Sequence, residues 1–205
     1  MDDRADEKET ARIEAFSDGV FAIAITLLIL EIKVPQEAGS EETLTKALAR
    51  QWPSYVAFLS SFATIGIMWI NHHRLFTHIR RIDHGLLVLN SLLLLAVVVV
   101  PFPTALLAAH WGGPGERVAA IVYSGLFVVV AVFFNLLWRY AAGGNRLLRK
   151  NAAADVKAIT RQYSFGPLLY LLCLGLAFVS VVASVAGAIA LAIFFALPPK
   201  ARPDA

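Results

Sequence analysis

The sequence predicts an all-α integral membrane protein, and three observations lead to that fold class. Hydrophobic residues make up 58% of the 205 residues, charged residues make up only 16%, and the mean hydropathy is +0.66. A soluble chain is about half apolar and about a quarter charged, and one of this size could not hide so much apolar surface. The apolar residues also form long continuous runs without the alternation of a barrel strand.

A membrane-spanning helix needs roughly 20 mostly apolar residues, and the chain holds five runs of at least that length. The last run, 162–197, is too long for one span, so we expect it to divide near Ser180–Ser184. The prediction is a six-helix domain over 12–198 between tails at 1–11 and 199–205. Its spans lie at about 12–34, 52–76, 85–110, 117–141, 162–180 and 183–197.

Charge sets the orientation of these spans. An even number of spans places both termini on one side, and that side then carries fourteen Lys and Arg residues against four on the other. Positive residues gather on the cytoplasmic side, so we expect both termini in the cytoplasm and the protein in the cell membrane. The same bias explains the pI near 9.2, and no nucleic-acid partner is expected. The longest outer loop, 36–51, is expected to contain a short amphipathic helix.

Several classes of function lack their sequence signatures. Cys173 is the single cysteine, so the chain has no disulfide framework. No Cys/His cluster has the spacing of a zinc site. The G-x-S-x-G, H-E-x-x-H and Walker patterns of common enzymes are absent from the sequence. We therefore expect no enzyme activity, no bound metal and no cofactor.

The first span, RIEAFSDGVFAIAITLLILEIKVP, carries an ionisable residue, Asp18, inside an apolar helix. Such residues are expensive in a membrane and are candidates for function. On a helical wheel, Ser17 and Asp18 lie on the opposite side from an apolar stripe. The residues of that stripe lie within about 60° of Ile23 around the helix: Ile23, Thr26, Leu27 and Leu30.

Two arrangements of this helix follow. Either Asp18 faces a pore, or Asp18 is tied to neighbouring helices and the apolar stripe lines a narrow passage. Membrane depth favours the second arrangement, because Trp69, His72 and Asn90 are expected at the depth of Asp18. Their indole, imidazole and amide groups are able to donate hydrogen bonds to a carboxylate and so offset the cost of its burial.

At this point the motifs resemble those of the transmembrane protein 175 family of cation channels, best known as endolysosomal potassium channels. The first motif is Arg12-x-x-x-Phe16-Ser17-Asp18, followed by Gly-Val-Phe-Ala-Ile-Ala-Ile-Thr. The second span adds Trp69-x-x-His72-x-Arg74-x-Phe76. The third adds Asn90 and, later, Pro101-Phe102-Pro103-Thr104. The resemblance covers most of the chain, from the first motif to the end of the last span.

The resemblance implies a homotetramer in which four copies of the first helix surround a central pore for potassium, with membrane lipid as the other partner. Apolar side chains form the constriction in this family, and by position its narrowest point falls on Ile23. Leu27 and Leu30 continue the lining, and Thr26 adds a hydroxyl layer. No T-V-G-Y-G filter occurs in the sequence. The resemblance also implies a packing and hydrogen-bonding hub made of Arg12, Phe16, Ser17, Asp18, Trp69, His72 and Asn90.

Two other functions stay open on the sequence alone. Asp18 and His72 are able to carry protons in a proton-coupled transporter or a proton-permeable channel. A membrane scaffold that conducts nothing is the third class. Ion flux separates the three, because a channel follows the gradient, a transporter couples two fluxes and a scaffold passes none.

Overall fold

The computed structural model describes residues 3–35, 41–149 and 153–197. The predicted tail at 199–205 and residues 36–40 of the outer loop lie outside these ranges. The described residues form helices and no strand longer than one residue pair. The helices are α1 (Asp3–Leu27), η1 (Leu28–Glu31), α2 (Glu41–Arg50), α3 (Trp52–His78), α4 (His84–Val99), α5 (Pro101–His110), α6 (Glu116–Ala142), η2 (Gly143–Asn145), α7 (Ala153–Ser164), α8 (Gly166–Ala177) and α9 (Val181–Ala196).

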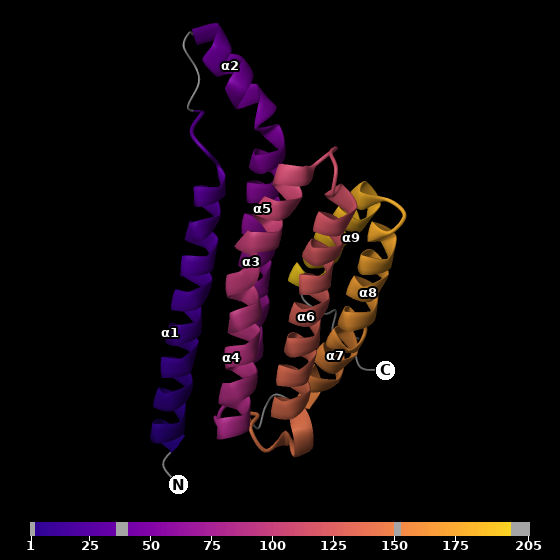
Figure 1. Cartoon of the computed structure of the whole chain (residues 1–205). Helices are drawn as coiled ribbons and strands as arrows, with labels where there is room; N and C mark the ends of the chain where they lie inside the picture. Colours follow the sequence, from indigo (N-terminus) through magenta and orange to yellow (C-terminus); the bar gives the residue numbers. More distant parts are fainter. Residues whose placement is uncertain (1–2, 36–40, 150–152, 198–205) are drawn as a thin grey trace.

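The long helices run side by side as a bundle, with α1 along one edge and α8 and α9 along the other (Figure 1). The centre is α6, which packs against α4, α5, α8 and α9 and contributes eleven buried residues to the core. The edge helix α1 packs against α3 and α4. Because α1 has neighbours on one side of the protomer, its other side is left exposed.

Four helical stretches of the described chain are long and apolar enough to cross a membrane: 8–31, 52–78, 84–110 and 116–145. They overlap the first four predicted spans. The third stretch divides at Val100 because Pro101, which lacks a backbone N–H, begins α5. The all-helical membrane class of the prediction is therefore confirmed, while the total of six spans stays a prediction.

The last apolar run differs from its prediction. In place of one helix over 162–180, α7 begins at Ala153 and a turn at Phe165 separates it from α8. Pro167 stands in the first turn of α8, where a missing N–H costs least. The next break falls at 178–180, close to the expected division. Ser180 begins α9 by accepting a hydrogen bond from the Ala183 N–H through its Oγ.

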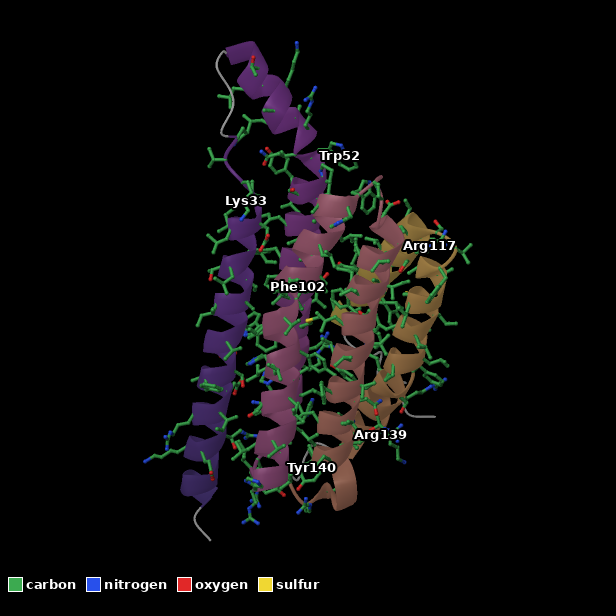
Figure 2. All side chains as sticks on the ribbon, viewed as in Figure 1. Lys33, Trp52, Phe102, Arg117, Arg139 and Tyr140 are labelled. Carbon is green, nitrogen blue, oxygen red and sulfur yellow. The ribbon has the colours of Figure 1, made fainter. Side chains whose placement is uncertain are left out.

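Two contacts fix which helix ends lie together. The Thr10 hydroxyl donates to the Arg80 carbonyl at 3.0 Å, which ties α1 to the segment after α3. Arg74 Nη2 donates to the Ala196 carbonyl at 3.1 Å, which brings the end of α9 to the same region. The start of α1 and the end of α9 therefore lie at one end of the bundle. Figure 2 shows Arg139 and Tyr140 at this end and Lys33, Trp52 and Arg117 at the other.

A polar cluster closes this end of the bundle. Asp83 caps α4, with its Oδ1 accepting from the Leu86 N–H at 2.9 Å. Its Oδ2 accepts from the Tyr140 hydroxyl at 2.9 Å and lies 3.0 Å from Arg146 Nη2. Partial burial opposes ionisation, but the two hydrogen bonds and the Arg146 cation outweigh it and lower the pKa of Asp83 below its usual value.

Candidate functional site

One face of α1 is built into the protomer. Ser17, Phe21, Ala24 and Leu28 recur at spacings of four, three and four residues, and each is at most 1% exposed. That spacing places them on a single side of a helix. They pack toward α3 and α4. The first motif therefore contributes a buried face, with one hydroxyl among apolar side chains.

A chain of hydrogen bonds crosses this face and joins three helices. His72 Nε2 on α3 lies 2.8 Å from Asn90 Oδ1 on α4. Asn90 Nδ2 donates to Ser17 Oγ on α1 at 3.0 Å, and Ser17 Oγ donates to the Ile13 carbonyl at 2.8 Å. Because the Asn90 oxygen is an acceptor, His72 must carry its proton on Nε2 to complete the chain. We call Ser17, His72 and Asn90 the polar chain.

Aromatic side chains pack around the polar chain. The rings of Phe21 and Phe76 lie with their centroids 5.3 Å and 4.4 Å from that of His72. The remaining ring nitrogen, His72 Nδ1, is buried and has no hydrogen-bond partner among the described residues. Each of the three polar side chains is at most 2% exposed. The three side-chain hydrogen bonds join α1, α3 and α4, and buried hydrogen bonds of this kind fix how the helices pack.

Asp18 does not belong to this chain. Its Oδ1 accepts a hydrogen bond from Trp69 Nε1 at 2.8 Å, in a pair that reaches the surface. Trp69 also stacks on His73, which pairs with Glu14 of α1. The structure therefore divides the predicted hub into a buried chain and an exposed row of pairs. No direct hydrogen bond joins Asp18 to His72 in the described structure.

Two residues of the predicted hub lie apart from it. Phe16 is 62% exposed, and Arg12 is exposed without a hydrogen bond or ion pair to any other residue of the described ranges. Phe16 instead lies on the exposed side of α1. The predicted hub leaves out Phe21 and Phe76, although both stand in the motifs and each lies four residues after a residue of the polar chain, at the spacing of neighbours on a helix.

The opposite face of α1 is an exposed apolar stripe. Ile23 is 58% exposed, Leu27 40% and Leu30 60%. The Thr26 hydroxyl is turned back onto its own helix and donates to the Ile23 carbonyl at 2.9 Å. Phe16 continues the stripe seven residues before Ile23. A row of large, exposed apolar side chains is surface available to lipid, to another subunit or to a pore. We call Ile23, Thr26, Leu27 and Leu30 the α1 stripe.

Among the described residues, no group of three or more His, Cys, Asp or Glu side chains is placed to hold a metal ion. The chemistry of the site is therefore that of hydrogen bonds on one side of α1 and apolar contact on the other.

Comparison with known proteins agrees with these features. The family model described as endosomal/lysosomal potassium channel TMEM175 matches residues 12–101, a range that includes the polar chain and the α1 stripe. A protein from Chamaesiphon minutus named a potassium channel is 54% identical over 203 residues, covering 98% of this chain and all of the relative. A Bos taurus protein named an endosomal/lysosomal proton channel is 37% identical over 138 residues, 63% of this chain and 29% of that protein.

The fold has a solved counterpart. A crystal structure of a lysosomal potassium-selective channel TMEM175 homologue from Chamaesiphon minutus superposes with a TM-score of 0.83 at 54% identity. The superposition covers 92% of this chain and 97% of that one. The similarity therefore extends over the whole helical bundle.

Proposed function

The chain belongs to the TMEM175 family, and from that premise we propose that it is a prokaryotic potassium-permeable cation channel whose pore is lined by α1. The relatives are named as channels, so the chain is not an enzyme, as its sequence predicted. The observation that carries the proposal is that α1 has one buried polar face and one exposed apolar face. The polar chain holds α1 against the protomer, and the α1 stripe is left facing outward.

The constriction in this proposal is a ring of apolar side chains. In a homotetramer, four copies of Ile23 surround the axis, with Leu27 and Leu30 above them. A narrow apolar ring controls conduction by wetting and drying. Because such a ring supplies no oxygen atoms to replace lost water, it favours the ion that is more easily dehydrated. We therefore propose modest selectivity for potassium over sodium.

The proposed topology has six spans and both termini in the cytoplasm. The contacts of Thr10 with Arg80 and of Arg74 with Ala196 support an even number of crossings, because they bring α1's start and α9's end together. The two last crossings consist of α7 with α8, and of α9. With 16 residues, α9 is about 24 Å long at 1.5 Å per residue, which is shorter than a hydrocarbon core of about 30 Å.

Proton permeation is the second candidate, and a relative named a proton channel is the observation that favours it. A route through Asp18 and His72 has less support, because these residues bond to different partners and the polar chain ends on a backbone carbonyl. A proton path through this protein would then follow the α1 stripe, where brief water wires cross an apolar ring. The coupled transporter needs an alternating site, and nothing in the described residues supplies one.

The experiment that tests the proposal is potassium flux into liposomes containing the purified protein. Flux is measured with and without an opposing proton gradient, and an uncoupler collapses that gradient in a matched sample. Passive potassium flux that is insensitive to the proton gradient is expected. Flux that requires the gradient would instead indicate a coupled transporter. No flux from protein that is folded and assembled would indicate a scaffold.

A further inference from the structure

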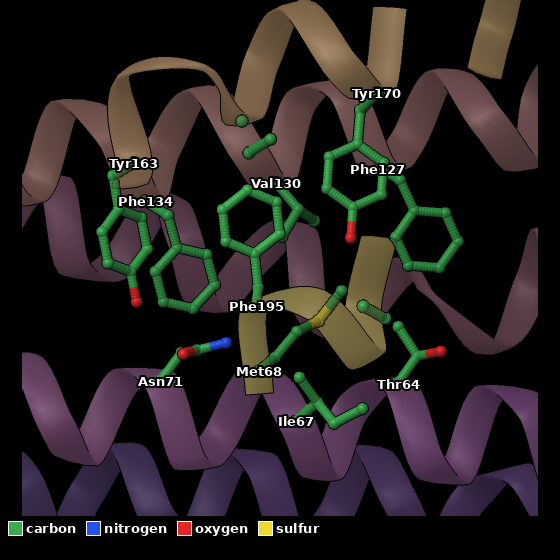
Figure 3. Close-up of a pocket in the computed structure, with 13 residues that line it drawn as sticks. Thr64, Ile67, Met68, Asn71, Phe127, Val130, Phe134, Tyr163, Tyr170 and Phe195 are labelled. Atoms are coloured by element: carbon green, nitrogen blue, oxygen red, sulfur yellow. The ribbon is translucent and has the colours of Figure 1, made fainter. Parts of the chain in front are cut away.

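A pocket lies inside the protomer, away from the α1 stripe. It is partly open and is lined by residues of α3, α6, α7, α8 and α9 (Figure 3). Its α3 wall includes Asn71, which follows the pocket-facing Met68 by one turn and precedes His72 of the polar chain. The helix α3 therefore separates the polar chain on one side from this pocket on the other. Five rings line the remaining walls: Phe127, Phe134, Tyr163, Tyr170 and Phe195.

Two polar atoms in this pocket are buried without a partner. Asn71 Oδ1 and the Tyr163 hydroxyl make no hydrogen bond in the described structure, although the two residues are only 5% and 6% exposed. Figure 3 shows the Tyr163 hydroxyl directed toward the Asn71 side chain at one end of the pocket. A buried donor and a buried acceptor left unpaired are costly. A ligand that forms a hydrogen bond with both groups therefore gains binding free energy.

The size of the pocket limits what that occupant is. The cavity volume is about 40 Å³, and a water molecule needs roughly 10–15 Å³ on such a measure. The space therefore suits a molecule of about three or four heavy atoms. The small side chains of Ala131 and Ala192 on the lining leave this space open. No charged side chain lines the pocket, so an ion would lose its hydration without compensation.

We propose that this pocket binds a small neutral alcohol of about the size of 2-propanol. Its hydroxyl group donates to Asn71 Oδ1 and accepts from the Tyr163 hydroxyl, and its alkyl carbons lie against the rings of Phe134 and Phe195. A single hydroxyl group meets both needs because it is a donor and an acceptor at once. Water meets the polar need but leaves the aromatic walls without contact. This inference does not rest on the proposed channel function.

The test compares two ligands that share one skeleton, 2-propanol and acetone. Both accept a hydrogen bond, but only 2-propanol donates one. Saturation-transfer NMR on the full-length protein in deuterated detergent measures each affinity, which we expect to be roughly millimolar for 2-propanol. Tyr163→Phe should weaken both ligands roughly 2- to 10-fold, because both lose the Tyr163 donor. Asn71→Leu should remove the preference for 2-propanol over acetone.

Tyr55→Phe is the matched control, since it removes a hydroxyl from α3 outside the pocket and should leave both affinities unchanged. The ratio of the two ligands within one variant cancels their partition into detergent. Absence of saturable 2-propanol binding would leave water as the occupant and overturn the proposal. Equal affinity of 2-propanol and acetone in the unsubstituted protein would also overturn it, because Asn71 would then have no part in recognition.

Discussion

The two faces of α1 differ in burial and in polarity. The face that contains Ser17, Phe21 and Ala24 is buried, and its polar atoms are paired with α3 and α4. The face that contains Ile23 and Leu27 is apolar and exposed. Polar residues in a membrane are usually the first candidates for function. Here Ser17 and Asn90 bond to partners within the protomer, and large apolar side chains are the ones left exposed.

Substitutions on the two faces should therefore have different effects. Changes on the buried face should unfold or loosen the protomer, whatever the protein conducts. Changes on the exposed face should leave the protomer folded and alter only what happens at that surface. Two measurements separate the faces: the stability of the purified protein and the ion flux per assembled protein.

Ile23→Asn should give the largest effect, and it should be on flux. A polar side chain keeps the proposed constriction wet, so we expect potassium flux to rise about tenfold, which corresponds to a barrier lower by about 1.4 kcal/mol. Selectivity over sodium should weaken, and thermal stability should change little because Ile23 is 58% exposed. Liposome flux with potassium and then sodium measures both.

Ile29→Asn is the matched control, because Ile29 is 53% exposed and lies off the α1 stripe. It should leave flux and selectivity as they were. If Ile23→Asn conducts potassium with unchanged rate and selectivity, Ile23 is not the narrow point.

Asn90→Leu should give the largest loss of stability. Leu removes the acceptor of His72 and the donor to Ser17, so two buried polar groups lose a partner at once. We expect the free energy of unfolding to fall by about 2–3 kcal/mol. Chemical unfolding in detergent measures it, and gel filtration reports assembly. Ser91→Ala, which alters an exposed hydroxyl bonded to its own helix, should change stability by a few tenths of a kcal/mol.

A stable Asn90→Leu protein would contradict the role given to the polar chain. The stability measurement also separates the two faces of α1, because an Asn90 variant that folds should conduct as the unsubstituted protein does.

Asp18→Ala should have a smaller effect on stability than Asn90→Leu. The carboxylate accepts one hydrogen bond from Trp69 at the surface, so we expect a loss of about 1 kcal/mol together with poorer assembly. Trp69→Phe removes the other partner of the same bond and should give a similar loss. A folded and fully assembled Asp18→Ala protein that conducts nothing would instead give Asp18 a direct part in permeation.

Features that depend on a short stretch of sequence could be predicted, whereas features that depend on how helices pack could not. The long apolar helices and the side of α1 that carries Ile23 follow from hydropathy and helical spacing, and the structure places them accordingly. For the polar chain, the sequence predicts residues at one membrane depth and, by resemblance, a hydrogen-bonding hub, but not which side chain bonds to which. Its pairing, with His72 on Asn90 rather than on Asp18, depends on how the helices are rotated against one another. Helix rotation is a tertiary property that one chain's pattern does not specify.

The last apolar run shows a second limit. Ser180 lies at the expected division and caps α9, but the turn at Phe165 that precedes Pro167 falls inside the predicted span 162–180, because hydropathy alone does not mark a break there. The meeting of Tyr163 of α7 and Asn71 of α3 at one pocket has no signal in the sequence.

Asp83→Asn should give the smallest effect, and that effect should depend on pH. The pKa of Asp83 is lowered in the folded protein by the Leu86 and Tyr140 hydrogen bonds and by Arg146, against the opposing effect of burial. A lowered folded pKa means that the carboxylate stabilises the fold above its unfolded pKa of about 3.9, and that this contribution is lost as the pH falls through the folded pKa. Asn keeps an acceptor but loses the charge facing Arg146, so we expect a loss below about 1 kcal/mol at pH 7.

Unfolding of both proteins across acid pH checks this expectation. The difference between Asp83→Asn and the unsubstituted protein should be constant near neutrality and should disappear in acid below the folded pKa. Near neutrality the loss caused by Asn90→Leu should be the larger of the two, because it leaves two buried polar groups without a partner. A difference at Asp83 that survives acid would mean that shape and hydrogen bonding, rather than charge, hold this end of the bundle. The charged loop and the buried face of α1 would then be stabilised in the same way.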